Sequence, residues 1–400
     1  SPADAVETRD GDAGVEIEIG RGKKARRAYG FDDIAIVPSR RTRDAEDVDI
    51  GWKLGPYLVE LPLLASAMDG VVTPSTAIAL GRMGGIGVLN LEGIWGRYDD
   101  AGKQLEEIAG LEKGEATRRM QEIYQEPLKP DLMAQRIREI KAAGVLAAAS
   151  LTPQRVRQNY EAVLEAGLDI LVIQGTVVSA EHVSTVVEPL NLKEFIAGLP
   201  VPVIVGGCAS YQTALHLMRT GAAGVLVGVG PGAACTTRGV LGVGVPQATA
   251  IADAAAARVQ HLIETGQYCN VIADGGMRTG GDIAKAVACG ADAVMVGSPL
   301  ARAHEAPGQG YHWGMATFHP TLPRGARVKT NQVATLEEVV LGPARENDGT
   351  LNLMGALRTS MATCGYETIH EFQKAEIMFA PALQTEGKKL QNEQGIGMSR

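Results

Sequence analysis

The chain of 400 residues is poor in cysteine and has none of the common disulfide or zinc-binding patterns. Its five cysteines are scattered and form neither a CxxC pair nor a Cys/His cluster. Glycines interrupt every apolar stretch before it reaches the ~18 residues that a membrane helix needs. The acidic, polar start SPADAVETRDGDAG lacks the pattern of a secretory signal peptide. We therefore expect a cytoplasmic protein without membrane contact.

Positive charge is also in short supply. The chain has 38 lysines and arginines against 46 acidic residues, and its formal net charge is -8 at pH 7. Nucleic acids and anionic membranes attract proteins through basic surfaces, so neither is expected as a partner. A ligand that carries phosphate must then be held by a local site. The HExxH, Walker and GxSxG motifs are missing as well.

What the chain does contain is a series of short apolar runs, most of them followed by a helix-like segment. None alternates between apolar and polar residues, which is typical of parallel strands buried on both faces. A glycine turn such as EAGLD (165–169) precedes several of them and ends the helix before. Eight such units predict a single (β/α)8 TIM barrel rather than an open doubly wound sheet. The runs are 61–68, 85–90, 145–150, 169–175, 202–207, 224–230, 270–276 and 293–298.

Three connections are too long for minimal barrel units. Residues 91–144 after strand two predict a helical elaboration, and residues 231–268 after strand six hold a cysteine loop and a long helix. Residues 299–355 after strand eight predict a mobile flap. In a barrel all three emerge at the C-terminal ends of the strands, where active sites lie. The expected plan is a disordered tail, one barrel and a flexible tail, over residues 1–15, 16–384 and 385–400.

Glycines end strands seven and eight, in the segments VIADGGMRTGGD (271–282) and AVMVGSPLA (293–301). Glycine lets backbone N–H groups approach an anion, and barrels often bind phosphate at this place. Gly276, Gly297 and Ser298 are therefore candidates for a phosphate site. Asp274 offers two acceptor oxygens that suit a ribose diol. The alternative is that these are turn glycines and a helix-capping aspartate.

Cys235 lies on the loop GPGAAC shortly after strand six. A thiolate is a good nucleophile when local dipoles lower its pKa, and the backbone amides of this loop precede a predicted helix. The alternative, a buried inert thiol, suits the other four cysteines better. The closely spaced carbonyls of Gly230, Gly232 and Cys235 also offer a site for a monovalent cation.

These segments resemble the IMP dehydrogenase and GMP reductase family. The resemblance runs from about residue 20 to 380 and is closest to IMP dehydrogenase-related proteins that lack CBS domains. Regulation of the enzyme by nucleotides through such domains is therefore not expected. The motifs that carry the resemblance are GFDDIAIVPSR (30–40), PLLASAMDGVV (62–72), GPGAACTTRGVLGVGVPQ (230–247), ADGG (273–276), MVGS (295–298) and EAPGQGYHWGM (305–315).

The resemblance implies a role for most of these residues. Cys235 would attack C2 of the purine, and Thr237 would assist at that carbon. Asp274 would bind the ribose hydroxyls, whereas Gly314 and Met315 would contact the base. The matches to the family's contacts with the phosphate and its surroundings are Ser66, Gly276, Gly297 and Ser298. The matches to its potassium ligands are the carbonyls of Gly230, Gly232 and Cys235.

The chain departs from the family pattern at several contacts. Ala233 stands where a serine usually precedes the cysteine by two residues, which removes one phosphate hydroxyl. Gln174 replaces an aspartate at the end of strand four that recognises the nicotinamide ribose, so Gln174 and Gly230 are the predicted cofactor contacts. His312, with Tyr311 beside it, matches the tyrosine near the start of the flap.

The same resemblance leaves two reactions open. A dehydrogenase would oxidise IMP to XMP with NAD+ and K+, and a reductase would convert GMP to IMP with NADPH. Gln332 aligns with the residue that contacts the purine edge, and a glutamine suits the N1–H and O6 edge of hypoxanthine, which favours the dehydrogenase. The arginine–tyrosine pair that activates water in dehydrogenases has no clear counterpart. Arg324 and Arg327 are the nearby arginines in the flap.

Two readings from other classes remain. The phosphate segment also looks like that of FMN-dependent barrel oxidases, but no suitable HxxR motif stands before strand seven. A catalytically inactive nucleotide sensor would not need Cys235 and Thr237. By resemblance we expect a homo-oligomer, a tetramer or an octamer.

Overall fold

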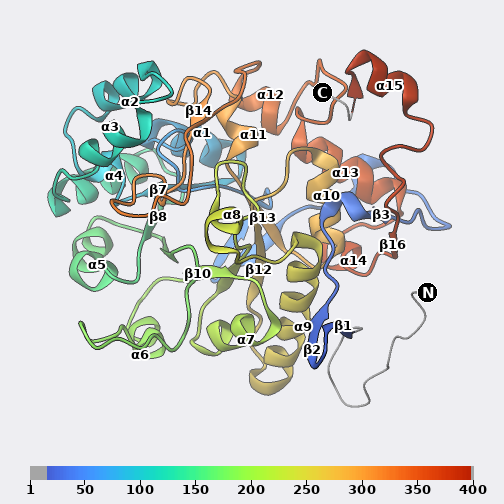
Figure 1. Ribbon diagram of the computed structural model, residues 1–400, viewed down its shortest axis with the longest axis horizontal. Helices are drawn as coiled ribbons and strands as arrows, with labels where there is room; N and C mark the ends of the chain where they lie inside the picture. The colour runs from blue at the N-terminus through green and yellow to red at the C-terminus, as the bar shows by residue number, and fades with distance from the viewer. Residues whose placement is uncertain (1–15, 398–400) are drawn as a thin grey trace.

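The computed structural model describes residues 16–397 and contains a closed parallel barrel of eight strands (Figure 1). Each predicted run matches one strand, although β8 and β10 each end one residue beyond the predicted run, and the barrel closes where Val294 pairs with Leu63. The predicted (β/α)8 barrel is thus confirmed. The strands are β6 (Leu63–Ala65), β7 (Ile86–Asn90), β8 (Ala148–Leu151), β9 (Ile170–Gln174), β10 (Val203–Cys208), β11 (Gly224–Val227), β12 (Asn270–Asp274) and β13 (Ala293–Val296).

Burial on both faces explains why the strands lack alternation. Leu64 and Val88 belong to the cluster that fills the barrel interior, together with other strand residues. Their sequence neighbours Leu63 and Leu89 pack outward in the larger cluster between strands and helices. Because both positions need apolar side chains, the strand pattern is continuous rather than alternating.

The helices that surround the barrel end at the predicted glycine turns. Gly167, Gly221 and Gly290 have φ of 101°, 92° and 126°, the left-handed conformation that favours glycine after a helix. The helices around the barrel are α1 (Pro74–Met83), α4 (Pro130–Ala142), α5 (Val156–Glu165), α6 (Leu192–Ala197), α7 (Tyr211–Arg219), α9 (Gln247–Thr265), α10 (Gly280–Ala288) and α13 (Leu353–Thr363).

The three long connections contain further elements. Those after β7 are η3 (Ile94–Gly96), α2 (Ala101–Gly110) and α3 (Ala116–Ile123), which confirms the helical elaboration. The cysteine loop after β11 leads into α8 (Thr237–Leu241). The flap after β13 holds α11 (Ser298–Ala301), β14 (Tyr311–His312), β15 (Val328–Lys329) and α12 (Leu336–Val340).

The flap lies against the helical elaboration, and β14 is drawn close to α2 and α3 in Figure 1. The ring of Phe318 stacks on Tyr124 with centroids 3.7 Å apart. Arg327 donates hydrogen bonds to the backbone carbonyls of Ile108 and Leu111 at the end of α2. These contacts describe a docked flap, and its mobility stays a prediction.

Short elements at both ends of the chain complete the fold. They are β1 (Glu16–Gly20) with β2 (Lys23–Arg26), β4 (Trp52–Leu54) with β5 (Tyr57–Val59), β3 (Ile34–Ile36) with β16 (Ile377–Phe379), then η1 (Phe31–Asp33), η2 (Ala45–Asp47), α14 (Ile369–Phe372) and α15 (Lys389–Gln394). The predicted tail over 1–15 lies outside the described residues. The predicted tail over 385–400 includes α15, and its last three residues are likewise outside them. No helix within residues 16–397 is long and apolar enough to cross a membrane.

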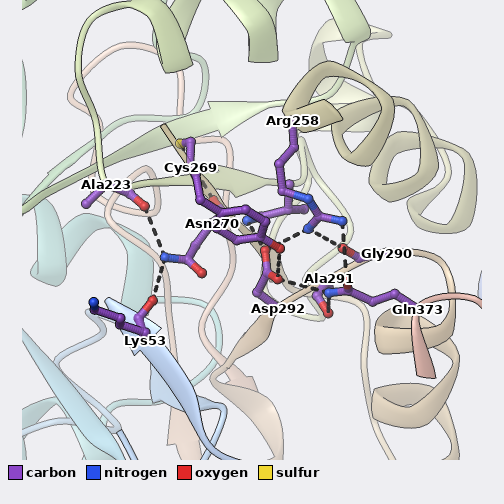
Figure 2. Close-up of polar contacts among 11 residues, drawn as sticks. Lys53, Ala223, Arg258, Cys269, Asn270, Gly290, Ala291, Asp292 and Gln373 are labelled. Carbon is purple, nitrogen blue, oxygen red and sulfur yellow. Dashed lines mark hydrogen bonds and ion pairs between the residues drawn. The ribbon is translucent and has the colours of Figure 1, made fainter. Parts of the chain in front are cut away.

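A buried polar cluster holds the N-terminal end of the barrel, opposite the active-site end. Asp292, directly before β13, accepts four hydrogen bonds, two on each carboxylate oxygen (Figure 2). The donors are Arg258 at 2.7 Å, the backbone N–H of Val271 at 2.8 Å, Tyr268 at 2.5 Å and Gln373 at 2.9 Å. Because its donors come from different elements, Asp292 links α9 and the segment after α14 to the barrel strands β12 and β13.

Replacing Asp292 with alanine is expected to lower the free energy of unfolding by about 3–5 kcal/mol, because the Arg258 guanidinium would stay buried without its partner. Thermal unfolding followed by circular dichroism measures the effect as a fall in Tm. The control is Glu107→Ala, which breaks a half-exposed ion pair with Arg119 that is worth about 1 kcal/mol or less. Equal shifts in the two variants would contradict the structural role of Asp292.

Candidate active site

A cavity of about 710 Å³ lies at the C-terminal ends of the barrel strands. Its size suits a small-molecule or nucleotide ligand. The loops after β6, β9, β11, β12 and β13 and the flap all line it. The predicted site residues that the structure brings to this cavity are Ser66, Gln174, Gly230, Gly232, Cys235, Asp274, Gly276, Gly297, Ser298, His312, Gly314, Met315 and Arg324.

Cys235 lies half-buried in this cavity beside a threonine. Its thiol donates to Thr237 Oγ1 at 3.1 Å, and Thr237, the first residue of α8, is itself buried. Elsewhere burial raises the pKa of Cys208 and Cys289 to about 12, which keeps those thiols protonated and inert. Cys235 is the cysteine that combines access to the cavity with a hydroxyl neighbour.

The cysteine loop and the flap are joined by backbone hydrogen bonds. Cys235 and Gly325 form an antiparallel bridge, and the Thr236 N–H donates to the carbonyl of Arg324 at 3.1 Å. The Ala326 N–H donates to the carbonyl of Ala234 at 2.8 Å. This pairing sets Arg324 next to the thiol, a placement that depends on contacts some 90 residues apart in sequence.

Gly276 and Gly297, which we call the glycine cradle, follow β12 and β13 and line the cavity. Gly276 has φ of 82°, and a Cβ on it would lie 3.1 Å from Pro231. A Cβ on Gly297 would lie 2.6 Å from the sulfur of Met68. A side chain at Gly276 would be strained by this backbone conformation, and one at Gly297 would have to displace the Met68 side chain, so both positions favour glycine and allow an anion to approach the backbone closely. Ser298 begins α11 beside them and adds a hydroxyl.

Asp274 ends β12 at the wall of the cavity. Burial raises the pKa of its carboxyl to about 7, and the amide of Gln174 lies 3.4 Å from its Oδ2. The side chain of Gln247 holds this strand end, because its amide donates to the carbonyls of Val227, Asp274 and Gly275 at 3.0–3.1 Å. Sequence reasoning missed Gln247. The available signal was a polar residue at the start of an alanine-rich helix, which by itself indicates no contact.

His312 enters the cavity from the flap. It is 2% exposed, and neither ring nitrogen has a hydrogen-bond partner in the protein. Burial lowers its pKa to about 4, so the imidazole is neutral at pH 7 and offers one donor and one acceptor to a ligand. Tyr311 does not line the cavity, and the guanidinium of Arg327 stacks 4.1 Å above its ring. Of this pair, His312 is the one at the site.

Three further candidates lie away from the cavity wall. Thr237 acts at most through Cys235, as described above. Arg327 is held by the carbonyls at the end of α2, so it anchors the flap instead of facing the ligand. Gln332 donates to the carbonyls of Ala303 and Ala306 at 2.9 and 3.2 Å and is not among the residues that line the cavity. The strand β15 pairs with β14 and leads Gln332 back to the segment after α11, which sequence alignment with a gap does not reveal.

Comparison with known proteins identifies the family. Residues 28–388 match the IMP dehydrogenase / GMP reductase domain, a span that includes every cavity residue named above. The chain belongs to the IMP dehydrogenase/GMP reductase family. It is therefore related to oxidoreductases that act on purine nucleotides, in agreement with its cysteine loop.

Individual relatives agree with this assignment. An oxidoreductase of Mycolicibacterium smegmatis, described as uncharacterized, is 49% identical over 367 residues, which cover 90% of this chain and 98% of that protein. A crystal structure of an IMP dehydrogenase/GMP reductase-like protein from Corynebacterium glutamicum matches with a TM-score of 0.87 at 45% identity, over 91% of this chain and 98% of the other. The inosine-5′-monophosphate dehydrogenase of Cryptosporidium parvum is 30% identical over 370 residues, 86% of this chain and 90% of that enzyme.

A nicotinamide dinucleotide is one ligand that the family implies. Gln174, the predicted contact for its ribose, lines the same cavity as Cys235. An amide offers a donor and an acceptor to a diol, so the residue fits such a contact without the charge of an aspartate. Gly230, the second predicted contact, also borders this cavity.

A potassium ion, the other implied group, fits the loop less well. The carbonyl of Gly232 already accepts the Cys235 N–H at 3.1 Å. The side chain of Arg238 packs on Gly230, where a Cβ would lie 2.8 Å from Arg238 Cγ and 3.4 Å from its Nε. The positive charge of the Arg238 guanidinium, which binds the carbonyl of Val229 next to Gly230, opposes the binding of a second cation there. The predicted potassium site is thus not supported by the arrangement of this loop.

Proposed function

We propose that the protein is an IMP dehydrogenase, which oxidises IMP to XMP with NAD+. The observation that carries the proposal is the cavity that combines the Cys235 thiol, the Asp274 carboxyl and the glycine cradle. These three groups match a reactive purine carbon, a ribose diol and a phosphate. The neutral His312 adds a further donor for the nucleotide.

The proposed oxidation of IMP begins at the thiol of Cys235. Cys235 Sγ forms a bond to C2 of the purine, and the thiol proton leaves to solvent. Oxidation at C2 removes its hydrogen with the electron pair as hydride, and a bound NAD+ would supply the acceptor for it. Water then adds to C2 and the S–C2 bond breaks, with one hydrogen of the water returning to sulfur and the other staying on XMP. The proton that the thiol lost in the first step is therefore the only net proton released. Thr237 orients the sulfur through its hydrogen bond.

Absorbance at 340 nm tests the proposal directly. IMP with NAD+ should produce NADH, whereas GMP with NADPH should show no decrease. NADPH consumption with GMP, and no reaction with IMP, would replace the proposal by GMP reductase. The position of Gln332 removes one reason to prefer the dehydrogenase, so both arms of this assay are needed.

The carboxyl of Asp274 makes nucleotide binding depend on pH. Its pKa of about 7 means that it is largely protonated below pH 7. The two hydroxyls of a ribose donate their hydrogen bonds best to the ionised carboxylate. A ligand that needs the ionised form must displace the proton, so the affinity for IMP should fall as pH falls, by up to about tenfold per pH unit below 7. Isothermal titration calorimetry from pH 8 to about pH 5.5 measures this slope.

Two controls isolate the contribution of Asp274. 2′-Deoxy-IMP has the same phosphate but lacks one hydroxyl, so the ratio of the two affinities should narrow as pH falls. In the variant Asp274→Asn the ratio should be small at every pH. A ratio that stays constant from pH 8 to about 5.5 in the unmodified protein would separate Asp274 from ribose recognition.

A further inference from the structure

Arg238 donates hydrogen bonds to both ends of the cysteine loop. Its Nε donates to the carbonyl of Val229 at 3.2 Å, and its Nη2 donates to the carbonyl of Val245 at 2.8 Å. These carbonyls flank the loop before Cys235 and the turn after α8. One guanidinium therefore ties together the two ends of the segment that presents the thiol.

The seat of this arginine is built from glycines. A Cβ on Gly244 would lie 2.7 Å from both Cγ and Nε of Arg238, and a Cβ on Gly230 would lie 2.8 Å from Cγ. Because neither glycine has a side chain, the arginine fits between the segment before Cys235 and the segment after α8. Arg238 also borders the cavity that Cys235 lines.

A positive charge in this place performs what a bound cation would do. The partly negative carbonyl oxygens of a tight loop repel one another, and a cation that they coordinate holds them together. A guanidinium carries a permanent charge and donates hydrogen bonds in fixed directions. We propose that Arg238 is a positioning residue that replaces a monovalent metal ion in ordering the cysteine loop, so that the protein works without K+.

The first test compares salts on the unmodified protein. It uses the IMP and NAD+ assay of the proposed function at constant ionic strength in potassium, sodium or tetramethylammonium chloride. The expected result is a turnover rate that differs by less than about twofold among the salts. Activation by potassium of about tenfold or more over tetramethylammonium would overturn the proposal.

The second test removes the guanidinium. Arg238→Gln should lose at least about tenfold in turnover in tetramethylammonium and recover part of it in potassium, because a metal ion can then enter the vacated seat. Arg238→Lys keeps the charge and should retain more activity than Arg238→Gln. The matched control is Arg219→Gln on α7, whose exposed pair with Glu264 lies on the outer helices. Full activity of Arg238→Gln in every salt would also overturn the proposal.

A third readout does not depend on the proposed function. The rate at which iodoacetamide alkylates Cys235, followed by mass spectrometry, reports how the loop presents the thiol. It should be the same in all three salts for the unmodified protein and become salt-dependent in Arg238→Gln. If neither nucleotide pair turns over in any salt, the proposed function fails, and this alkylation rate alone decides the role of Arg238. An alkylation rate that depends on potassium in the unmodified protein contradicts that role.

Discussion

Replacing Cys235 with alanine is expected to lower the rate of NADH formation from IMP by at least about 1,000-fold, because the covalent route is lost with the sulfur. The glycine cradle and Asp274 are untouched by this change, so the dissociation constant of IMP should stay within about threefold of its original value. Absorbance at 340 nm measures the first quantity, and isothermal titration calorimetry measures the second. The expected split between catalysis and binding is what identifies a nucleophile.

The matched control is Cys289→Ala. Cys289 is also half-buried, but it follows α10 at the other end of the barrel, far from the cavity lining. Its replacement should leave turnover unchanged, and a shared loss of activity would point to a general effect of cysteine removal. Turnover by Cys235→Ala within about tenfold of the original rate would exclude the covalent mechanism.

The barrel was predictable because its signals are local. Each strand is a short apolar run between a glycine turn and a loop, and each needs only its own sequence to be recognised. The same is true of Cys235, whose glycine-rich surroundings are visible in the sequence. The common position of Gly276 and Gly297 at the cavity follows from the barrel topology, since the ends of strands seven and eight are neighbours in any such barrel.

The placement of the flap was not predictable in this way. Arg324 and Arg327 are three residues apart, yet one borders the cavity and the other is held by carbonyls at the end of α2. Contacts between segments more than 200 residues apart decide this difference. The position of Gln332 outside the cavity lining has the same cause, because the pairing of β14 with β15 sets where the chain runs afterwards.

Arg238 shows a related limit. In the sequence it is one charged residue in a short helix, and nothing adjacent to it indicates a partner. The two carbonyls that it contacts precede and follow the loop, and the glycines that make room for it are fourteen residues apart. The spacing of the loop carbonyls and the family resemblance both suggested a monovalent cation, and only the folded arrangement reveals a cationic side chain there.

Replacing Arg324 with alanine should slow steady-state turnover by about 100-fold while leaving hydride transfer nearly unchanged. The Arg324 segment pairs with Cys235, its side chain borders the cavity, and its buried Nε has no hydrogen-bond partner in the protein. Such a group can hold the water that attacks C2 in the second half of the reaction. Stopped-flow absorbance should show a rapid burst of NADH, stoichiometric with active sites, followed by a slow phase.

Arg327→Ala is the matched control, because it removes the same charge from an arginine that does not line the cavity. Because Arg327 anchors the flap to α2, its loss should loosen the flap that carries His312, Gly314 and Met315, and should therefore raise the KM for IMP more than it lowers kcat.

Acid quenching and intact-protein mass spectrometry should detect the covalent adduct on Cys235 during turnover of Arg324→Ala. A burst rate that falls in parallel with the steady-state rate would place Arg324 in the hydride step and leave the flap without its water-holding group.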